Sequence, residues 1–424
     1  MFKRNVLAVS MAVAGLCSAQ AMAAVVGGGA TLPQNLYGVP DTGSVAAPDG
    51  ILNGASPLAG FNNYVGIGSG GGKTSFLTNN SNLLVWDVDG VASTAPTQVY
   101  PTAVTVDYAG SDSILSATEI STYQAAHQSP GVPTSSAANW GPLIQIPAAA
   151  TSVTIPYKLT LASGTAVNNL NLTSADLCNI FSGTYTTWNQ VNSSFPATAI
   201  KVVYRSNSSG TTEILSRHLN SQCPTKFTTN STFATANTGA EPATWLTVTT
   251  SPAMASTVAA TEGAIGYVGP EDVNASSNAV VAKVNGLLPT IGNVTTALST
   301  VAPPKGTSGV AAEDRSVPAN WAKVLPNPTS GYSIVGYTFL VFNQCYKDSA
   351  DNTAVRNFIN RHYTVADTSN NDNAIIAAKL IPLTDSTTLG YDDWKQAVRN
   401  TFFLASSSLA VGNATACASI GRPL

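Results

Sequence analysis

Apolar runs with strand character alternate with amphipathic stretches along most of the chain. The longest apolar run, 334–342, predicts the most deeply buried strand, and the alternation over 104–109 predicts a second one. Other β-rich runs cover 143–147, 151–157 and 263–268. Helical periodicity or cap signals mark the segment from Ala117 onward, 173–181, 212–219, 354–363 and 394–404. Strands alternating with helices predict an α/β fold.

Two β-rich regions divide this pattern into two lobes. We interpret the runs at 143–157 and 334–342 as two crossings of the chain between the lobes. The crossings predict a discontinuous outer lobe of residues 24–148 plus 336–424 and a continuous inner lobe of residues 149–335. The segment 285–328 is rich in Pro, Ser, Thr and Val without a sustained period, which predicts an irregular connection.

The stretch 204–213, Tyr-Arg-Ser-Asn-Ser-Ser-Gly-Thr-Thr-Glu, predicts a strand end, a tight turn and a helix start. The first turn of a helix has free backbone N–H groups at the positive end of the macrodipole, which suits an oxyanion. Ser209 and Thr211 add hydroxyl donors, Gly210 allows close approach, and Arg205 can bind two oxygens at once. An ordinary helix N-cap is the alternative interpretation.

Three other segments combine donors with strand or helix ends. Gly27 to Pro33 is glycine-rich and leads through Thr31 into a predicted helix, although a flexible N-terminus fits equally well. Gly66 to Thr74 resembles a nucleotide-binding P-loop, but Ile67 occupies the position of its first glycine, so we expect only a loop that presents Ser69. Asp112 follows the predicted strand at 104–109, where it could hold a ligand or cap the next helix.

Composition narrows the possible functions. Only 10% of the residues are charged and the formal net charge is -3, so the chain has no basic surface of the kind that binds nucleic acid. Any anion site must therefore be a local arrangement of donors. Residues 1–23 have a basic start, an apolar run and the small residues Ala21-Met22-Ala23, which predicts a secretory signal peptide. Acylation of Cys17 is disfavoured because the bulky Leu16 precedes it.

Four cysteines follow the predicted signal peptide. An even number in an exported protein favours disulfides, and pairing by neighbourhood gives Cys178 with Cys223 and Cys345 with Cys417. Zinc is the competing use of these residues. The chain lacks a Cys-x-x-Cys spacing and has only three histidines, so we predict no metal site and no cofactor.

With these residues in view, the chain resembles the phosphate-binding proteins that serve phosphate ABC transporters, and most closely their DING branch. The matching segments, in order, are 27–33, 68–70, 110–113, 204–206, 208–213 and 420–424. The resemblance implies a two-lobed, type II periplasmic-binding-protein-like α/β fold with phosphate in a cleft between the lobes. It implies that phosphate is held by Thr31, Leu32, Ser69, Asp112, Arg205, Ser209, Gly210 and Thr211. It also supports the two cysteine pairs.

Asp112 gives the implied site its selectivity. A carboxylate repels an anion unless the ligand offers it a proton, and hydrogen phosphate has a proton whereas sulfate does not. The chain departs from the family at Asn207, where relatives usually carry an acidic residue, and at 24–26, where Ala-Val-Val replaces Asp-Ile-Asn. The segments 41–60 and 79–102 are longer than typical and could cover the cleft.

Three functions follow from this resemblance. The first is a periplasmic or secreted receptor that captures inorganic phosphate as a monomer and delivers it to ABC permease subunits in the inner membrane. The second is a secreted phosphatase, which we disfavour because the sequence shows no metal cluster and no histidine beside a plausible serine nucleophile. The third is an extracellular phosphate-binding protein without a transport role.

Overall fold

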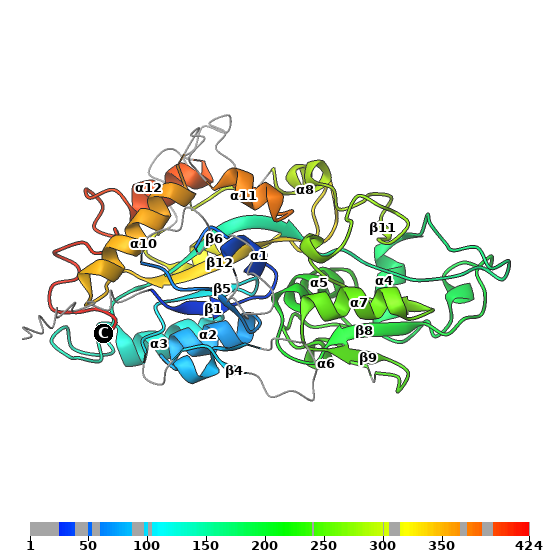
Figure 1. Ribbon diagram of the computed structural model, residues 1–424, viewed down its shortest axis with the longest axis horizontal. Helices are drawn as coiled ribbons and strands as arrows, with labels where there is room; N and C mark the ends of the chain where they lie inside the picture. The colour runs from blue at the N-terminus through cyan, green and yellow to red at the C-terminus, as the bar shows by residue number, and fades with distance from the viewer. Residues whose placement is uncertain are drawn as a thin grey trace, which may run out of the picture.

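A computed structural model describes residues 25–38, 50–52, 60–86, 97–100, 104–239, 241–299, 301–304, 314–364, 371–383 and 393–423. The predicted signal peptide lies outside the described residues, as do parts of the segments 41–60 and 79–102. No helix within the described ranges is long and apolar enough to cross a membrane. Figure 1 shows two lobes, one built from the blue and orange ends of the chain and the other from its green middle.

The first lobe is built on a sheet in the order β2-β1-β5-β12-β6. Its strands are β1 (Gly27–Gly29), β2 (Val65–Gly66), β5 (Tyr108–Ser111), β6 (Leu143–Ser152) and β12 (Val335–Asn343). Its helices are α1 (Gln34–Tyr37), α2 (Ser69–Leu77), α3 (Ala117–His127), α10 (Ser349–His362), α11 (Asp372–Ala377) and α12 (Trp394–Phe402). A 3-10 turn η1 (Ser81–Leu83) and the pair β3 (Val85–Trp86) and β4 (Thr97–Gln98) lie between α2 and β5 in the chain.

The second lobe holds a three-stranded parallel sheet in the order β10-β8-β9. Its strands are β8 (Lys201–Arg205), β9 (Leu246–Val248) and β10 (Ala264–Ile265), and a separate pair joins β7 (Asn171–Leu172) to β11 (Lys283–Val284). Its helices are α4 (Ser174–Phe181), α5 (Gly210–Gln222), α6 (Phe233–Ala236) and α7 (Ser251–Ala260), with 3-10 turns η2 (Trp188–Gln190) and η3 (Pro270–Asp272).

β6 and β12 are the two long strands that lead toward the second lobe. They pair antiparallel from Val335 opposite Ser152 to Asn343 opposite Leu143, with a register shift between Thr338 and Phe339. The shift leaves an extra residue next to Pro147, which has no N–H to give to the ladder. The crossing predicted from the sequence at 334–342 is therefore confirmed as a strand, whereas the exact lobe boundaries stay a prediction.

Three predicted elements are wrong in detail. The runs 143–147 and 151–157 were predicted as separate strands, but β6 is continuous to Ser152 because the bulge accommodates Pro147. The strand predicted at 104–109 is β5, which begins only at Tyr108, since the Val106 N–H donates to the Asn79 side chain at 2.8 Å. The connection predicted at 285–328 contains two helices, α8 (Ile291–Leu298) and α9 (Pro318–Trp321).

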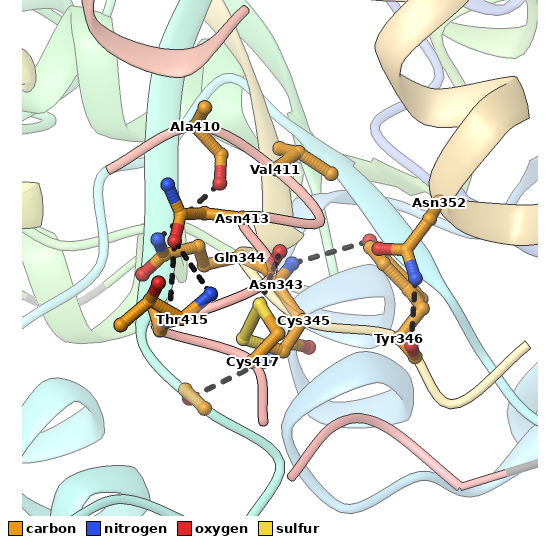
Figure 2. Close-up of a disulfide and its surroundings, with 12 residues drawn as sticks. Asn343, Gln344, Cys345, Tyr346, Asn352, Ala410, Val411, Asn413, Thr415 and Cys417 are labelled. Atoms are coloured by element: carbon orange, nitrogen blue, oxygen red, sulfur yellow. Dashed lines mark hydrogen bonds between the residues drawn. A yellow bond between two sulfur atoms is a disulfide. The ribbon is translucent and has the colours of Figure 1, made fainter. Parts of the chain in front are cut away.

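Both predicted disulfides are present. Cys178 of α4 and Cys223 at the end of α5 have Cα atoms 6.3 Å apart, so the bond fastens two packed helices of the second lobe. Cys345 and Cys417 have Cα atoms 5.3 Å apart and tie the C-terminal segment to the end of β12. Figure 2 shows this second bond beside Gln344, whose backbone and side chain contact the segment around residue 410.

The C-terminal motif has a structural position. The Arg422 side chain is fully buried in the first lobe, donates to Asn343 Oδ1 at 2.9 Å and to the Phe76 carbonyl, and lies over the rings of Phe76 and Trp140. The segment 420–423 thus packs against the sheet of the first lobe and contributes to its core rather than to an anion site.

Candidate anion site

The stretch at 204–213 folds as predicted into a strand end, a turn and a helix N-terminus. Arg205 ends β8, and Ser209 is the N-cap residue of α5. The Ser209 side chain makes no capping hydrogen bond, and its hydroxyl instead lies 2.7 Å from the Thr211 hydroxyl. A Cβ at Gly210 would lie 2.2 Å from Cβ of Asp112, so only glycine allows the helix to approach that carboxylate. The simple capping interpretation therefore does not account for Ser209.

The Arg205 guanidinium lies at the centre of this site and is only 2% exposed. Nε donates to Asn207 Oδ1 at 3.0 Å, while Nη1 lies 3.4 Å from the hydroxyls of Thr31 and Ser209 and 3.5 Å from that of Ser251. Nη2 is buried and has no hydrogen-bond partner among the described residues. Burial lowers the pKa of Arg205 to about 10, so it remains a cation at neutral pH with an unused donor.

Asp112 is the acceptor of the site. It directly follows β5, is 3% exposed, and its Oδ1 has no hydrogen-bond partner within the described ranges. It does not cap the next helix, because Ser116 caps α3 in a capping box with Glu119. Burial raises the pKa of Asp112 from 3.8 to about 7, and the nearby Glu213 adds to the rise, while the Thr338 hydroxyl, Arg205 and the Ser69 hydroxyl partly oppose it.

Ser69 lies at the N-terminus of a helix rather than in the loop that the sequence predicted. The glycine run continues as α2 because Gly72 packs on the sheet, where an added Cβ would lie 2.4 Å from Cα of Gly29. Ser69 is fully buried, and its hydroxyl oxygen accepts the Asp112 N–H at 3.0 Å. The Ser69 hydroxyl can in turn donate its hydrogen, either to the Asp112 carboxylate or to a ligand.

Thr31 and Leu32 come after β1, from which Ala30 separates them. The glycine-rich start predicted as a loop is the strand β1, which lies between β2 and β5 and pairs parallel with both. Thr31 is 6% exposed, and its hydroxyl reaches across to the second lobe. The Leu32 side chain is buried in the hydrophobic core, so any contact of Leu32 with an anion would come from its backbone N–H.

Ser251 is a site residue that the sequence analysis missed. It is the first residue of α7, is 1% exposed, and its hydroxyl lies 3.0 Å from the Thr31 hydroxyl. The Thr250-Ser251-Pro252 sequence before an apolar run is a helix-start signal that could have drawn attention to it.

The structure thus brings together seven of the predicted ligand residues, Thr31, Ser69, Asp112, Arg205, Ser209, Gly210 and Thr211, and places Leu32 next to Thr31 in the chain. The N-termini of α2, α5 and α7 contribute Ser69, Gly210 and Ser251 to the site, which favours negative charge. Hydroxyls and one guanidinium supply donors, and one carboxylate supplies an acceptor. Among the described residues, no three His, Cys, Asp or Glu side chains gather to hold a metal ion. This arrangement can hold an oxyanion that carries a proton.

Two α/β lobes connected by long strands, with an anion site between them, define a solute receptor of the type II periplasmic-binding-protein class. A model of the PBP superfamily domain matches residues 54–361. The chain is 47% identical over its full length, and over the full length of the relative, to the Pseudomonas aeruginosa protein named Alkaline phosphatase L.

Solved structures agree with this class. A phosphate-binding protein from Stenotrophomonas maltophilia is 37% identical with a TM-score of 0.76, and the alignment covers 95% of this chain and all of that one. A high-affinity periplasmic phosphate-binding protein, PfluDING, solved with bound phosphate, is 36% identical with a TM-score of 0.75 at the same coverage. The chain belongs to the DING and phosphate-binding family of periplasmic solute-binding proteins.

Proposed function

We propose that this protein captures inorganic phosphate between its lobes, through Thr31, Leu32, Ser69, Asp112, Arg205, Ser209, Gly210 and Thr211. The observation that carries the proposal is the pair of buried atoms that lack partners among the described residues, Arg205 Nη2 and Asp112 Oδ1. A donor and an acceptor facing one site require a ligand that both accepts and donates a hydrogen bond. Hydrogen phosphate does both, and an unprotonated sulfate only accepts.

Calorimetric titration of the purified protein with phosphate, sulfate and arsenate at pH 8.5 tests the proposal. We expect phosphate to bind at least about 100-fold more tightly than sulfate, because sulfate leaves the ionised Asp112 unpaired. Arsenate, which has the same protonation chemistry, should bind with an affinity close to that of phosphate and well above that of sulfate. Equal affinity for phosphate and sulfate, or no phosphate binding, would refute the proposal.

The physiological role that fits this site is delivery of phosphate to an ABC permease by a monomeric receptor outside the cytoplasm. The family and the predicted signal peptide support export to the periplasm or beyond. Deletion of the gene should impair phosphate uptake when phosphate is limiting. Normal uptake by the deletion strain would favour an extracellular binding protein without a transport role.

A phosphatase is the second candidate, since the relative from Pseudomonas aeruginosa carries that name. The sequence offered no histidine beside a plausible serine nucleophile, and in the structure His218 Nε2 lies 3.1 Å from the Ser174 hydroxyl. His218 Nδ1 lies 3.0 Å from the Pro326 carbonyl oxygen, which accepts its proton, and burial lowers the pKa of His218. The neutral ring therefore accepts a hydrogen bond from Ser174, the arrangement of a nucleophile and its base.

The position of this pair does not suit hydrolysis of the captured anion. His218 lies eight residues after Gly210 on α5, which places it about 12 Å farther along the helix axis. A nucleophile must come within about 3.5 Å of the phosphorus that it attacks. We infer that Ser174 and His218 stabilise the packing of α4 on α5.

Aryl phosphate hydrolysis by the wild type, the Ser174→Ala variant and a chelator-treated sample separates the two candidates. We expect no hydrolysis above the background of a mock purification in any sample. Turnover that Ser174→Ala abolishes would establish the enzyme instead, and turnover lost only on chelation would indicate a metal-dependent one.

A further inference from the structure

Ser251 joins the two lobes directly at the anion site. Its hydroxyl lies 3.0 Å from the Thr31 hydroxyl of the first lobe and 3.5 Å from Arg205 Nη1 of the second. Both hydroxyl-bearing residues are buried, at 1% and 6% exposure, and they lie 220 positions apart in the chain. Ser251 therefore contacts two of the residues assigned to phosphate.

The hydroxyl of Ser251 is not needed to cap its own helix. Thr250 is the N-cap residue of α7, and its side chain accepts the Ala253 N–H at 3.2 Å. Pro252, which follows Ser251, has no N–H that would need a partner. The hydroxyl of Ser251 is thus directed at the site instead of at the backbone of α7.

The chemistry of the contact couples Ser251 to the ligand. Arg205 can only donate, so its Nη1 can supply a hydrogen to either hydroxyl oxygen. One of the two hydroxyls, of Thr31 or of Ser251, then donates its hydrogen to the other. The second hydroxyl keeps its hydrogen for an anion oxygen, so the bonded pair offers the anion one oriented donor, and the pair forms only while the lobes are in contact.

We propose that Ser251 is a positioning residue that connects closure of the lobes to retention of phosphate, an inference that rests on the proposed function. Separation of the lobes breaks the hydrogen bond between Thr31 and Ser251 and withdraws the shared donor from the anion. Ser251 therefore acts on the rate at which phosphate leaves. It leaves the choice between phosphate and sulfate to Asp112.

The Ser251→Ala variant tests this role, with Ser256→Ala as its control. Ser256 lies on the same helix, is exposed, and among the described residues its hydroxyl bonds only to the Ala253 carbonyl. We expect Ser251→Ala to weaken phosphate binding by about three- to tenfold, the value of one net hydrogen bond. Stopped-flow tryptophan fluorescence should assign this change to faster dissociation, with association within about twofold of the wild type. The ratio of sulfate to phosphate affinity should stay unchanged.

A double-mutant cycle with Thr31→Val provides the second measurement. Because the two hydroxyls share one donor, the affinity losses of the two single variants should exceed in sum the loss in the double variant. The inference would be overturned if Ser251→Ala had the phosphate affinity and dissociation rate of the wild type, or if the losses in the cycle were additive. Either result would leave the proposed function, phosphate binding, standing. A wild-type protein that does not bind phosphate would instead overturn the proposed function and this inference together.

Discussion

The Asp112→Asn substitution tests the chemistry of the site most directly. Asn has nearly the same shape as Asp, but it carries no charge and presents an N–H₂ donor where one carboxylate oxygen stood. Asp112 Oδ1 is buried without a partner among the described residues, so the substitution changes the group that would face the ligand. Gly210 and Ser69, which lie against Asp112, need not move.

The expected magnitude follows from the cost of an unpaired buried acceptor. Sulfate in the wild-type site leaves a charged acceptor unpaired, which costs about 3 kcal/mol, or roughly 100-fold in affinity. Hydrogen phosphate avoids this cost because its proton is donated to Asp112. In the variant, sulfate can accept a hydrogen bond from Asn and phosphate loses a charge-assisted one. The ratio of sulfate to phosphate dissociation constants should therefore fall by about 100-fold or more.

Isothermal titration calorimetry at pH 8.5 measures this ratio with Asp112 ionised, since the pKa of Asp112 is about 7. A second series at lower pH supplies an internal check. As the pH falls from 8.5 toward 7, Asp112 gains a proton and can donate to sulfate, so sulfate affinity of the wild type should increase by up to about tenfold per pH unit and level off below pH 7. Asp112→Asn should show no such increase. An unchanged selectivity ratio in the variant would show that Asp112 is not the discriminating group.

Four further predictions concern stability and charge. Because burial raises the pKa of Asp112, its contribution to stability is full below pH 3.8 and is lost as the pH rises through 7. In urea unfolding without phosphate, the free energy of unfolding of the wild type should fall by about 3 kcal/mol relative to that of Asp112→Asn between pH 5 and 8. The same pH dependence of unfolding in both proteins would contradict this. Arg205→Lys should weaken phosphate binding by about 100-fold in calorimetry, because an ammonium cannot reproduce the guanidinium fork; a loss under threefold would contradict it. Asn207→Asp should weaken phosphate binding by up to about tenfold at low salt, through repulsion that added salt screens, and tighter binding would count against this account. Replacing Cys345 and Cys417 with Ser should cost about 4 kcal/mol in urea unfolding, as the bond closes a loop of 72 residues, and equal stability would exclude that role.

Short-range rules predicted much of the fold and part of the site. The segment from β8 into α5 follows from an apolar run, a Ser-Ser-Gly-Thr turn and a helix start within about twenty residues. The capping boxes at Thr173 and Ser116 place α4 and α3 by the same local logic. The two disulfides followed from neighbourhood in the chain, since each pair closes the shorter of the possible loops.

The glycine-rich segments could not be read in this way, because tertiary packing overrides their local preference. Glycine is a poor former of both strands and helices, so Gly27–Gly29 and the run at 70–72 were interpreted as loops. In the structure β1 and α2 lie so close that a side chain at Gly72 would collide with the backbone of Gly29, and a side chain at Gly29 would collide with the Gly110 carbonyl of β5. The glycines therefore mark a close contact between a strand and a helix, a reason that only the three-dimensional structure reveals.

Convergence of the site was equally hidden from local rules. Ser69 and Asp112 are 43 positions apart, and Thr31 and Arg205 are 174 apart. Nothing in the periodicity of either segment specifies the partner, and the family resemblance supplied the connection. Ser251 was not found because it belongs to neither the local motif nor the resemblance. Its role depends wholly on the contact with Thr31.

The low charge of this chain also indicates how the site would reach high affinity. A net charge of -3 and few basic residues give little long-range attraction for an anion, so electrostatic steering adds little to the association rate. Affinity must then come from slow release, which requires buried hydrogen bonds that the ligand cannot exchange for water one at a time. Contacts between the lobes, such as Thr31 with Ser251 and the Ile114 N–H with Glu213 at 3.4 Å, keep the site closed so that the hydrogen bonds to the ligand break together. The determinants of affinity therefore lie in the contacts that close the lobes as much as in the groups that face the anion.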